Sequence, residues 1–344
     1  MKALVLDAYN HFEYKEVEKP VITGDEVLIQ VKAVGICVSD VHGMDGSTGR
    51  RIPPIIMGHE ASGVIVEVGA NVSDWRPGDR VTFDSTIYRL DDWYTRKGLY
   101  NLSDHRVVLG VSCGEYRRHG AFADFVAIPQ HVLYHIPGAV EFTQAAMVEP
   151  VAVALHALSL SKTEVNDSVM VVGAGMIGLF LIQLLKVAGC GKIIAVDLDD
   201  DKLRLAAQMG ATHCLNSNLS WMKDEILSLT HGRGVDRAFE AVGISPTVLL
   251  AVAGVRKGGT VTLVGNLSPQ IEFPLQSVVT RQITIQGSCA NSGEYPAVLD
   301  LMAGGKICVD DMVSAEAPLS EGADWFHRLY NKEKGLIKVI LKPG

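Results

Sequence analysis

The chain has 344 residues, more than the roughly 100–200 of a typical single domain, so we expect two domains. With 48% hydrophobic and 20% charged residues, its composition is that of a globular protein. Its formal net charge is −8 and it contains no dense basic run. Binding to nucleic acid is therefore not expected.

No targeting or membrane segment is expected. The N-terminus turns polar by Asp7, too early for the apolar core of a secretory signal. Residues 169–185 carry no charge, but three glycines interrupt their first half, which predicts a strand, a turn and a helix instead of a membrane span. The six cysteines are scattered without a C-x-x-C pair and are interpreted as reduced thiols. We expect a cytoplasmic protein that does not bind membranes.

Short apolar runs separated by turn residues fill the first 150 positions. Residues 26–35, 61–69 and 78–83 are predicted strands, which indicates a mostly β domain. The pattern weakens over residues 84–119, interpreted as a polar surface lobe. Residues 150–162 repeat apolar positions at three and four, which predicts a helix.

Strands and helices then alternate, which is typical of βαβ units in a parallel sheet covered on both faces. The predicted strands span residues 169–175, 192–197, 235–243, 260–265 and 282–288. The predicted helices span residues 176–189, 201–210, 221–232 and 246–259. A helix over 294–305 and a strand over 336–341 follow. We expect an α/β chain whose domains cover residues 1–152, 153–289 and 290–344, the last part completing the first domain.

A G-x-G-x-x-G motif lies between the first predicted strand and helix of this α/β region, at Gly173, Gly175 and Gly178. The first glycine permits a tight turn, the second lets a pyrophosphate approach the backbone, and the third lets the helix pack on the strand. Asp197 ends the next predicted strand, 19 residues after Gly178, where a carboxylate binds the adenosine ribose. The motif predicts a dinucleotide site.

The acid at position 197 favours NAD over NADP, because a carboxylate repels a 2′-phosphate. Three further acids follow it at positions 199–201. The residues predicted to bind the cofactor are Gly173, Gly175, Met176, Ile177, Gly178, Asp197, Lys202, Val242 and Val264. A structural glycine turn with a helix-capping Asp197 is the alternative.

Cys37, His59, Glu60 and Glu149 could supply a metal with sulfur, nitrogen and oxygen ligands. Each alone is more often a buried hydrophobe or a satisfied polar group. Three protein ligands would leave a fourth coordination position open, which is the arrangement of a catalytic metal site. The sequence does not decide which glutamate binds the metal.

The order of GICVSD, GHEASGVIVEVG, PGDRV, EPVAVALHA and VVGAGMIG resembles the zinc-dependent medium-chain alcohol dehydrogenases over nearly the whole chain. The VEP motif at 148–150 and GLYNLS at 98–103 are most similar to the sorbitol (polyol) dehydrogenase branch. The resemblance implies a GroES-like catalytic domain, a doubly wound Rossmann domain, one catalytic zinc, NAD and a homodimer or homotetramer.

The resemblance also implies roles for individual residues. Cys37 and His59 match the family's zinc ligands, Glu60 an acid that binds zinc in some members, and Glu149 the position that completes the shell or holds zinc-bound water. Ser39 would pass the alcohol's proton onward, with His42 an exit to water. Alternatively, Ser39 and Asp40 could simply cap a short helix.

Three departures from the family are visible. The lobe carries one cysteine, Cys113, instead of the four that hold a structural zinc in many relatives, so one zinc per subunit is predicted. Gly43 replaces an aromatic residue and Ala290-Asn291 replaces an Arg-Tyr pair ahead of Tyr295, which makes sorbitol itself a doubtful substrate. Four polar residues could approach the cleft but are interpreted as a solvated loop: Glu115, Arg117, Arg118 and His119.

The sequence thus predicts a zinc- and NAD-dependent dehydrogenase acting on a secondary alcohol of a polyol or sugar-like substrate. Threonine 3-dehydrogenase or vicinal-diol dehydrogenase activity on the same scaffold is the alternative within enzymes. A zinc-free quinone reductase would need neither Cys37 nor the His59-Glu60 pair. A non-catalytic NAD-binding redox sensor is the alternative from another class.

Overall fold

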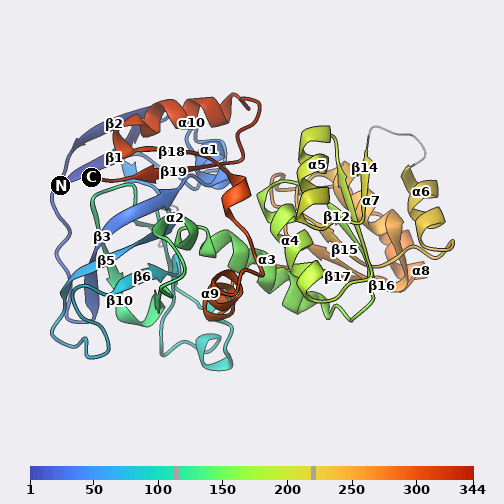
Figure 1. Cartoon of the computed structure of the whole chain (residues 1–344), viewed down its shortest axis with the longest axis horizontal. Helices are drawn as coiled ribbons and strands as arrows, with labels where there is room; N and C mark the ends of the chain where they lie inside the picture. The colour runs from blue at the N-terminus through green and yellow to red at the C-terminus, as the bar shows by residue number, and fades with distance from the viewer. Residues whose placement is uncertain (112–116, 218–221) are drawn as a thin grey trace. The chain divides into compact units, whose positions relative to one another are not determined.

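The computed structural model describes residues 1–111, 117–217 and 222–344, which form two compact units (Figure 1). Unit 1 comprises Met1–Glu149 and Ser292–Gly344, and unit 2 comprises Pro150–Asn291. The sequence predicts domain boundaries at 152/153 and 289/290 instead of 149/150 and 291/292. Helix α3 (Val148–Ser161) begins in unit 1 and continues in unit 2.

Unit 2 is built on a six-stranded sheet in which every neighbouring pair of strands is parallel. Its strands follow one another in space as β14 (His213–Asn216), β13 (Lys192–Asp197), β12 (Ser168–Val172), β15 (Val235–Glu240), β16 (Val255–Leu263) and β17 (Thr284–Gly287). The order reverses between β12 and β15. Dinucleotides bind at such a reversal in doubly wound folds.

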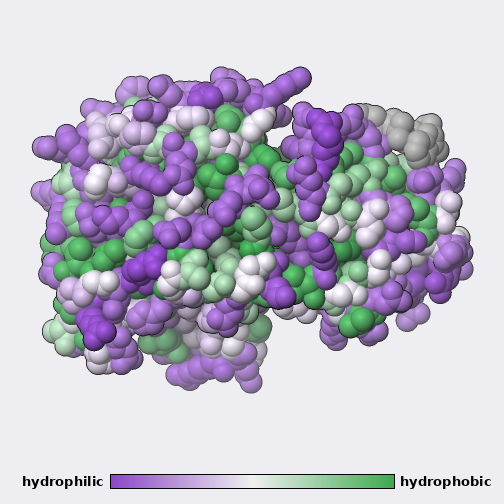
Figure 2. Space-filling view, viewed as in Figure 1, coloured by the Kyte–Doolittle hydropathy of each residue, from purple (hydrophilic) through white to green (hydrophobic). Residues whose placement is uncertain are grey.

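Helices cover both faces of this sheet, which confirms the predicted doubly wound fold (Figure 1). On one face lie α4 (Met176–Val187) and α5 (Asp200–Met209), and on the other α6 (Met222–Leu229), α7 (Ser245–Gly254) and α8 (Leu275–Thr280). In α5, Leu203, Ala206 and Met209 are buried. The exposed side of this helix is strongly hydrophilic (Figure 2). This amphipathic pattern holds α5 on the sheet.

The prediction of one helix over residues 246–259 is wrong. Helix α7 ends at Gly254, and β16 begins at Val255. Gly258 adopts a φ of +68°, which a continued α-helix does not allow, and the pairing of β15 with β16 shifts register across this stretch. Strand β14 and helix α8 were not predicted, and Trp221, the first residue of another predicted helix, lies outside the described residues.

The uncharged stretch at 169–185 forms β12, a turn and α4, as predicted. No helix in the described part of the chain combines the length and apolar character needed to cross a membrane.

Unit 1 is mostly β structure around a seven-stranded sheet, in agreement with the predicted β domain. The main path is β11 (Leu133–His135), β6 (Arg80–Phe83), β5 (Glu60–Val68), β3 (Glu26–Gly35), β19 (Lys338–Lys342) and β18 (Val313–Pro318), with β10 (Phe125–Pro129) paired to β3. One smaller sheet contains β2 (His11–Glu16), β1 (Lys2–Ala8) and β4 (Ile55–Ile56); the predicted surface lobe carries another, formed by β7 (Thr86–Ile87), β8 (Val107–Leu109) and β9 (Arg117–Arg118).

Short helices complete unit 1. The α-helices are α1 (Val38–Gly43), α2 (Phe142–Ala145), α9 (Tyr295–Ala303) and α10 (Gly322–Tyr330). The 3₁₀ helices are η1 (Thr95–Lys97), η2 (Tyr100–Leu102), η4 (Gln130–Val132), η5 (Asp310–Met312) and η6 (Leu319–Glu321).

The end of β3 is the point from which unit 1 builds its polar site. Gly35, the last residue of β3, pairs with Glu60 of β5 on one side and with Ile340 of β19 on the other. The chain leaves β3 toward Cys37 and enters β5 from His59. Three segments distant in sequence are thereby brought together at one end of the sheet.

Candidate active site

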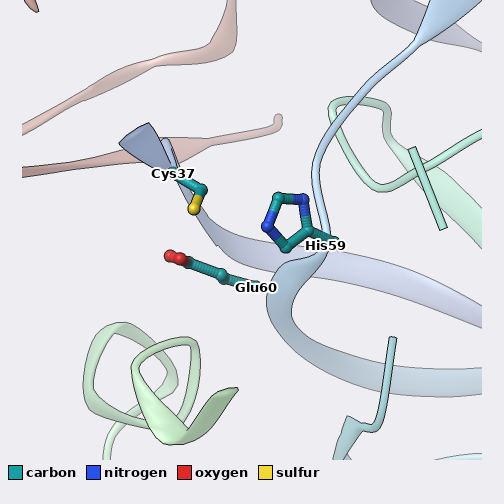
Figure 3. A group of neighbouring side chains, drawn as sticks. All are labelled: Cys37, His59 and Glu60. Carbon is teal, nitrogen blue, oxygen red and sulfur yellow. The ribbon is translucent and has the colours of Figure 1, made fainter. Parts of the chain in front are cut away.

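Cys37, His59 and Glu60 point toward a common space (Figure 3). One ligand atom from each, a sulfur, a ring nitrogen and a carboxylate oxygen, lies within 4.8 Å of the other two. His59 and Glu60 are buried, whereas Cys37 is half-buried at the N-cap of α1. Thiolate, imidazole and carboxylate are the ligands that zinc takes in proteins, so this donor set fits zinc.

The imidazole of His59 is oriented from behind. Its Nδ1 lies 3.3 Å from Oδ2 of Asp40, a fully buried carboxylate, so Nε2 is the nitrogen that faces Cys37 and Glu60 (Figure 3). Metal-binding histidines commonly present their second nitrogen to a carboxylate in this way. Burial opposes a charge on His59, but the Asp40 and Cys37 side chains outweigh it and raise the pKa of the imidazole. The negative groups around His59 therefore favour a positive charge at this position.

Glu60 is held by a buried lysine. Lys338 Nζ lies 2.6 Å from Glu60 Oε2 and also donates to the Ile36 carbonyl at 3.0 Å. A Cβ at Gly35 would lie 2.5 Å from the same Oε2, so glycine is needed beside the carboxylate. Burial lowers the pKa of Lys338, but the Glu60 carboxylate outweighs burial and raises it. Lys338 is therefore a protonated side chain held in a fixed position beside Glu60.

Glu149 lies in the first turn of α3 and is not one of the three residues that converge within 4.8 Å. Burial, and next the Glu60 carboxylate, raise the pKa of Glu149 to about 8. A divalent cation bound at this site would relieve that repulsion, which is a second reason why the residues present fit a zinc ion.

Tyr295, the first residue of α9, is fully buried and stacks on Tyr134 with ring centroids 4.7 Å apart. Its hydroxyl has no hydrogen-bond partner among the described residues. Burial, then the Asp84 and Glu149 carboxylates, raise the pKa of Tyr295 well above its usual value. The phenol therefore stays neutral and can donate a hydrogen bond.

The predicted proton-transfer residues lie on α1. Ser39 is exposed, and its Oγ donates to Cys37 Sγ at 3.2 Å. His42 is half-buried one turn further along the same helix. Asp40 does not cap this helix: Cys37 is its N-cap, and Asp40 instead faces His59.

The dinucleotide motif of unit 2 lies at the carboxyl edge of its sheet, after β12, where the strand order reverses between β12 and β15. Gly173 has a φ of +99°, and a Cβ at Gly178 would lie 1.8 Å from the Gly173 carbonyl oxygen. A Cβ at Gly175 would meet no atom within 4 Å. Gly173 therefore suits the turn, Gly178 suits the close packing of the helix, and Gly175 leaves the backbone open to a ligand.

The other predicted cofactor residues belong to the same region or its neighbours. Asp197 ends β13, Val242 follows β15 and Val264 follows β16, all at the carboxyl edge of the sheet. Met176 and Ile177 open α4, and Lys202 lies in α5. Asp197 Oδ2 accepts from the Ala174 amide at 2.7 Å, which ties the acid to the glycine turn.

The loop residues mostly have structural contacts. Arg118 Nη2 donates to Glu26 Oε1 at 2.6 Å, Arg117 donates to the Pro54 carbonyl at 2.6 Å, and His119 Nδ1 accepts from the Ile56 amide at 3.2 Å. Glu115 and Cys113 lie outside the described residues.

Gly43 is buried and lies directly beside the side chain of Arg51. A Cβ at position 43 would lie 2.4 Å from Cγ of Arg51, so this arginine fills the space beside the glycine. Ala290 has a φ of +50°, and Asn291 is buried.

Comparison with known proteins identifies the family. The profile described as an alcohol dehydrogenase GroES-like domain matches residues 23–138, and that of a zinc-binding dehydrogenase matches residues 177–304. The chain is 32% identical to a D-arabitol-phosphate dehydrogenase of Enterococcus avium, over 98% of this chain and 95% of that protein. It is also 32% identical to a sorbitol dehydrogenase of Bacillus subtilis (strain 168), over 100% and 98% of the two chains. The chain belongs to the zinc-type medium-chain alcohol dehydrogenases.

Within this family the chain falls in the polyol branch and is an oxidoreductase. A Sinorhizobium meliloti 1021 protein solved with NADP bound superimposes with a TM-score of 0.90 at 30% identity, covering 99% of each chain. That protein, described as a zinc-binding dehydrogenase, therefore shares the fold of this chain.

We call Cys37, His59 and Glu60 the metal group. Sequence reasoning did not find the contacts that four side chains make around it: Asp40, Arg51, Lys338 and Tyr295. A signal existed for one of them, since Lys338 is the one charged residue in the apolar run LIKVIL at 336–341, and it is buried in β19. Nothing near Arg51 in sequence indicates its burial.

Proposed function

We propose that the protein oxidises a secondary alcohol of a polyol or sugar-like substrate and transfers the hydride to NAD. The observation that carries this proposal is the convergence of Cys37, His59 and Glu60 in a chain whose second unit carries the dinucleotide motif. Unit 1 would be the catalytic domain and unit 2 the NAD-binding domain. The family assembles as dimers or tetramers, and we propose one of these states here, which a light-scattering mass would test.

Cys37 and His59 would hold the catalytic zinc, with Glu60 and Glu149 as the further carboxylates at the site. When bound, zinc supplies a Lewis acid that lowers the pKa of an alcohol hydroxyl, and NAD supplies the hydride acceptor. Lys338 limits the movement of Glu60, because it holds one carboxylate oxygen by a buried ion pair. One zinc per subunit is proposed.

Ser39 would receive the proton that the oxidation releases. Its hydroxyl lies on the exposed side of α1 and 3.2 Å from the Cys37 sulfur, so it is next to a proposed zinc ligand and still reachable from solvent. His42, three residues later on the same helix, would pass the proton on to water.

A preference for NAD over NADP is proposed from Asp197. Its carboxylate is half-exposed at the end of β13 and accepts a hydrogen bond from the Ala174 amide, so its charge lies beside the glycine turn. A 2′-phosphate there would be repelled. Two exposed acids, Asp199 and Asp200, add to this negative potential.

A polyol substrate is supported by the names of the two relatives, which act on sorbitol and on D-arabitol phosphate. The buried Tyr295 hydroxyl adds a polar group to the surroundings of Glu149 and Glu60. A threonine 3-dehydrogenase or vicinal-diol dehydrogenase shares the same metal chemistry.

Two measurements test the proposal. NADH absorbance with a panel of polyols, polyol phosphates, cyclitols, amino alcohols and short diols should show turnover with a polyol-type compound and faster turnover with NAD than with NADP. Metal analysis of the purified protein should give about one zinc per chain. A protein that binds NAD but oxidises none of these alcohols would instead be the non-catalytic sensor.

A further inference from the structure

Arg51 is a buried cation next to the metal group that the proposed reaction does not use. Its side chain is 3% exposed, and the carboxylate of Asp40 beside it is fully buried. Arg51 Nε donates to Asp40 Oδ1 at 2.9 Å and Nη2 donates to the same oxygen at 2.6 Å. Two charge-assisted hydrogen bonds on a single oxygen anchor that oxygen of the carboxylate.

The remaining oxygen of Asp40 is the one that faces the metal group. Oδ2 accepts nothing from Arg51 and lies 3.3 Å from Nδ1 of His59. The guanidinium, the carboxylate and the imidazole therefore form one chain, whose far end is the His59 nitrogen directed at Cys37 and Glu60 (Figure 3). If Asp40 rotated, Oδ2 would leave His59.

Gly43 makes the position of Arg51 possible. An added Cβ at position 43 would lie 2.4 Å from Cγ and 3.3 Å from Cβ of Arg51, so a larger residue would displace the arginine stem. Arg51 Nη2 also lies 3.4 Å from the Ser39 hydroxyl, so the same side chain contacts the proposed proton-transfer residue.

We propose that Arg51 is a positioning residue of the metal site: by holding Asp40 through one oxygen, it directs the other at His59 and so fixes the imidazole for zinc. Gly43 leaves the space that the Arg51 side chain occupies. This inference rests on the proposed zinc-dependent function, because it concerns the ligand geometry that zinc would require. Substitutions behind a metal-bound histidine lower metal affinity by about 10- to 100-fold.

The test measures metal binding without turnover. Zinc affinity is determined by competition with a chromophoric chelator, and the cobalt(II) form is examined by its visible absorption, which reports ligand geometry. Arg51→Gln should weaken zinc binding by about 10- to 100-fold and change the cobalt spectrum. Arg51→Lys keeps the charge but lacks the planar fork, so it should restore part of the affinity.

Gly43→Ala tests the same geometry with Arg51 intact. It should weaken zinc binding, and the effects of Gly43→Ala and Arg51→Gln should be less than additive in the double variant, because both act through one side chain. If Arg51→Gln does not fold, Arg51→Lys and Gly43→Ala decide the matter.

Arg118→Gln is the matched control for Arg51→Gln. It breaks another ion pair of unit 1, whose partner Glu26 begins β3 while the metal group follows the end of that strand, roughly 30 Å away at 3.3 Å per residue. Zinc affinity and cobalt spectrum should match wild type. Wild-type affinity and an unchanged spectrum in the folded Arg51 and Gly43 variants would overturn the proposal. A wild-type protein unable to bind zinc would instead overturn the proposed function, which is why it is measured first.

Discussion

The two units build their polar sites from different materials. In unit 2 the dinucleotide motif occupies six consecutive residues, Gly173 to Gly178, and works through backbone conformation and the absence of side chains. In unit 1 the metal group is made of charged side chains, and the Lys338–Glu60 pair joins residues 278 positions apart. One site depends on local geometry, the other on long-range assembly.

The difference predicts that each site can be broken alone. A change at the metal group should leave dinucleotide binding intact, and a change at the glycine turn should leave zinc binding intact. The variants below test this independence.

Cys37→Ser should have the largest effect. Serine can still cap α1, but it removes the thiolate, so zinc should be lost and kcat should fall about 1000-fold or more, since Lewis-acid catalysis contributes several kcal/mol. Metal analysis and turnover measure the loss, while NAD binding, followed by fluorescence, should persist. Cys190→Ser, a half-buried thiol of unit 2, is the control and should change neither. Unchanged turnover in Cys37→Ser would rule out the zinc mechanism.

Asp197→Ser should weaken NAD binding by about 10- to 100-fold, the range expected for losing hydrogen bonds to a charged acceptor. The preference for NAD over NADP should become smaller. Titration with both dinucleotides measures it. Asp199→Ser removes a neighbouring acid that caps α5, so it separates the ribose contact from general negative charge. A wild-type protein that already prefers NADP would contradict the role given to Asp197.

A pair of alanine variants at the glycine turn should separate folding from binding. Gly178→Ala places a Cβ 1.8 Å from the Gly173 carbonyl oxygen, so unit 2 should lose about 1–3 kcal/mol of unfolding free energy together with NAD affinity. Gly175→Ala meets no protein atom within 4 Å, so it should lose NAD affinity without loss of stability. Urea denaturation and NAD titration measure both. Equal destabilisation in the two variants would refute the assigned roles.

Tyr295→Phe should have the smallest effect and the opposite sign. Removing a buried hydroxyl that has no hydrogen-bond partner in the described part of the chain should raise the unfolding free energy of the zinc-free protein by about 1 kcal/mol. Tyr134→Phe, in the same aromatic stack, is the control. A clear loss of stability in Tyr295→Phe would show that the hydroxyl has a partner in the folded protein.

The sequence predicted the parts that depend on local pattern. The order of strands and helices in unit 2 follows from hydrophobic periodicity, and Cys37, His59 and Glu60 stand in motifs short enough to compare with a family. The end of α7 at Gly254 was missed because Val255 and its successors suit a helix or a strand, and the neighbouring strand β15 decides between them.

The supporting charges could not be predicted in the same way. Arg51 lies in a polar stretch that local pattern interprets as a surface turn, and only the fold shows that Gly43 leaves room for it. Lys338 becomes informative once β19 is placed beside β3. Burial of charged side chains is a property of the assembled sheet, which no single segment encodes.

The interrupted path of the chain through unit 1 has a consequence for synthesis on the ribosome. Unit 2 is continuous and can fold while the remainder is still being translated, whereas the central sheet of unit 1 lacks β18 and β19 until residues 313–342 have emerged. Until then the Glu60 carboxylate cannot form its ion pair with Lys338. A nascent chain would thus acquire its nucleotide-binding half before its metal-binding half, and a ribosome stalled before residue 338 should present the first without the second.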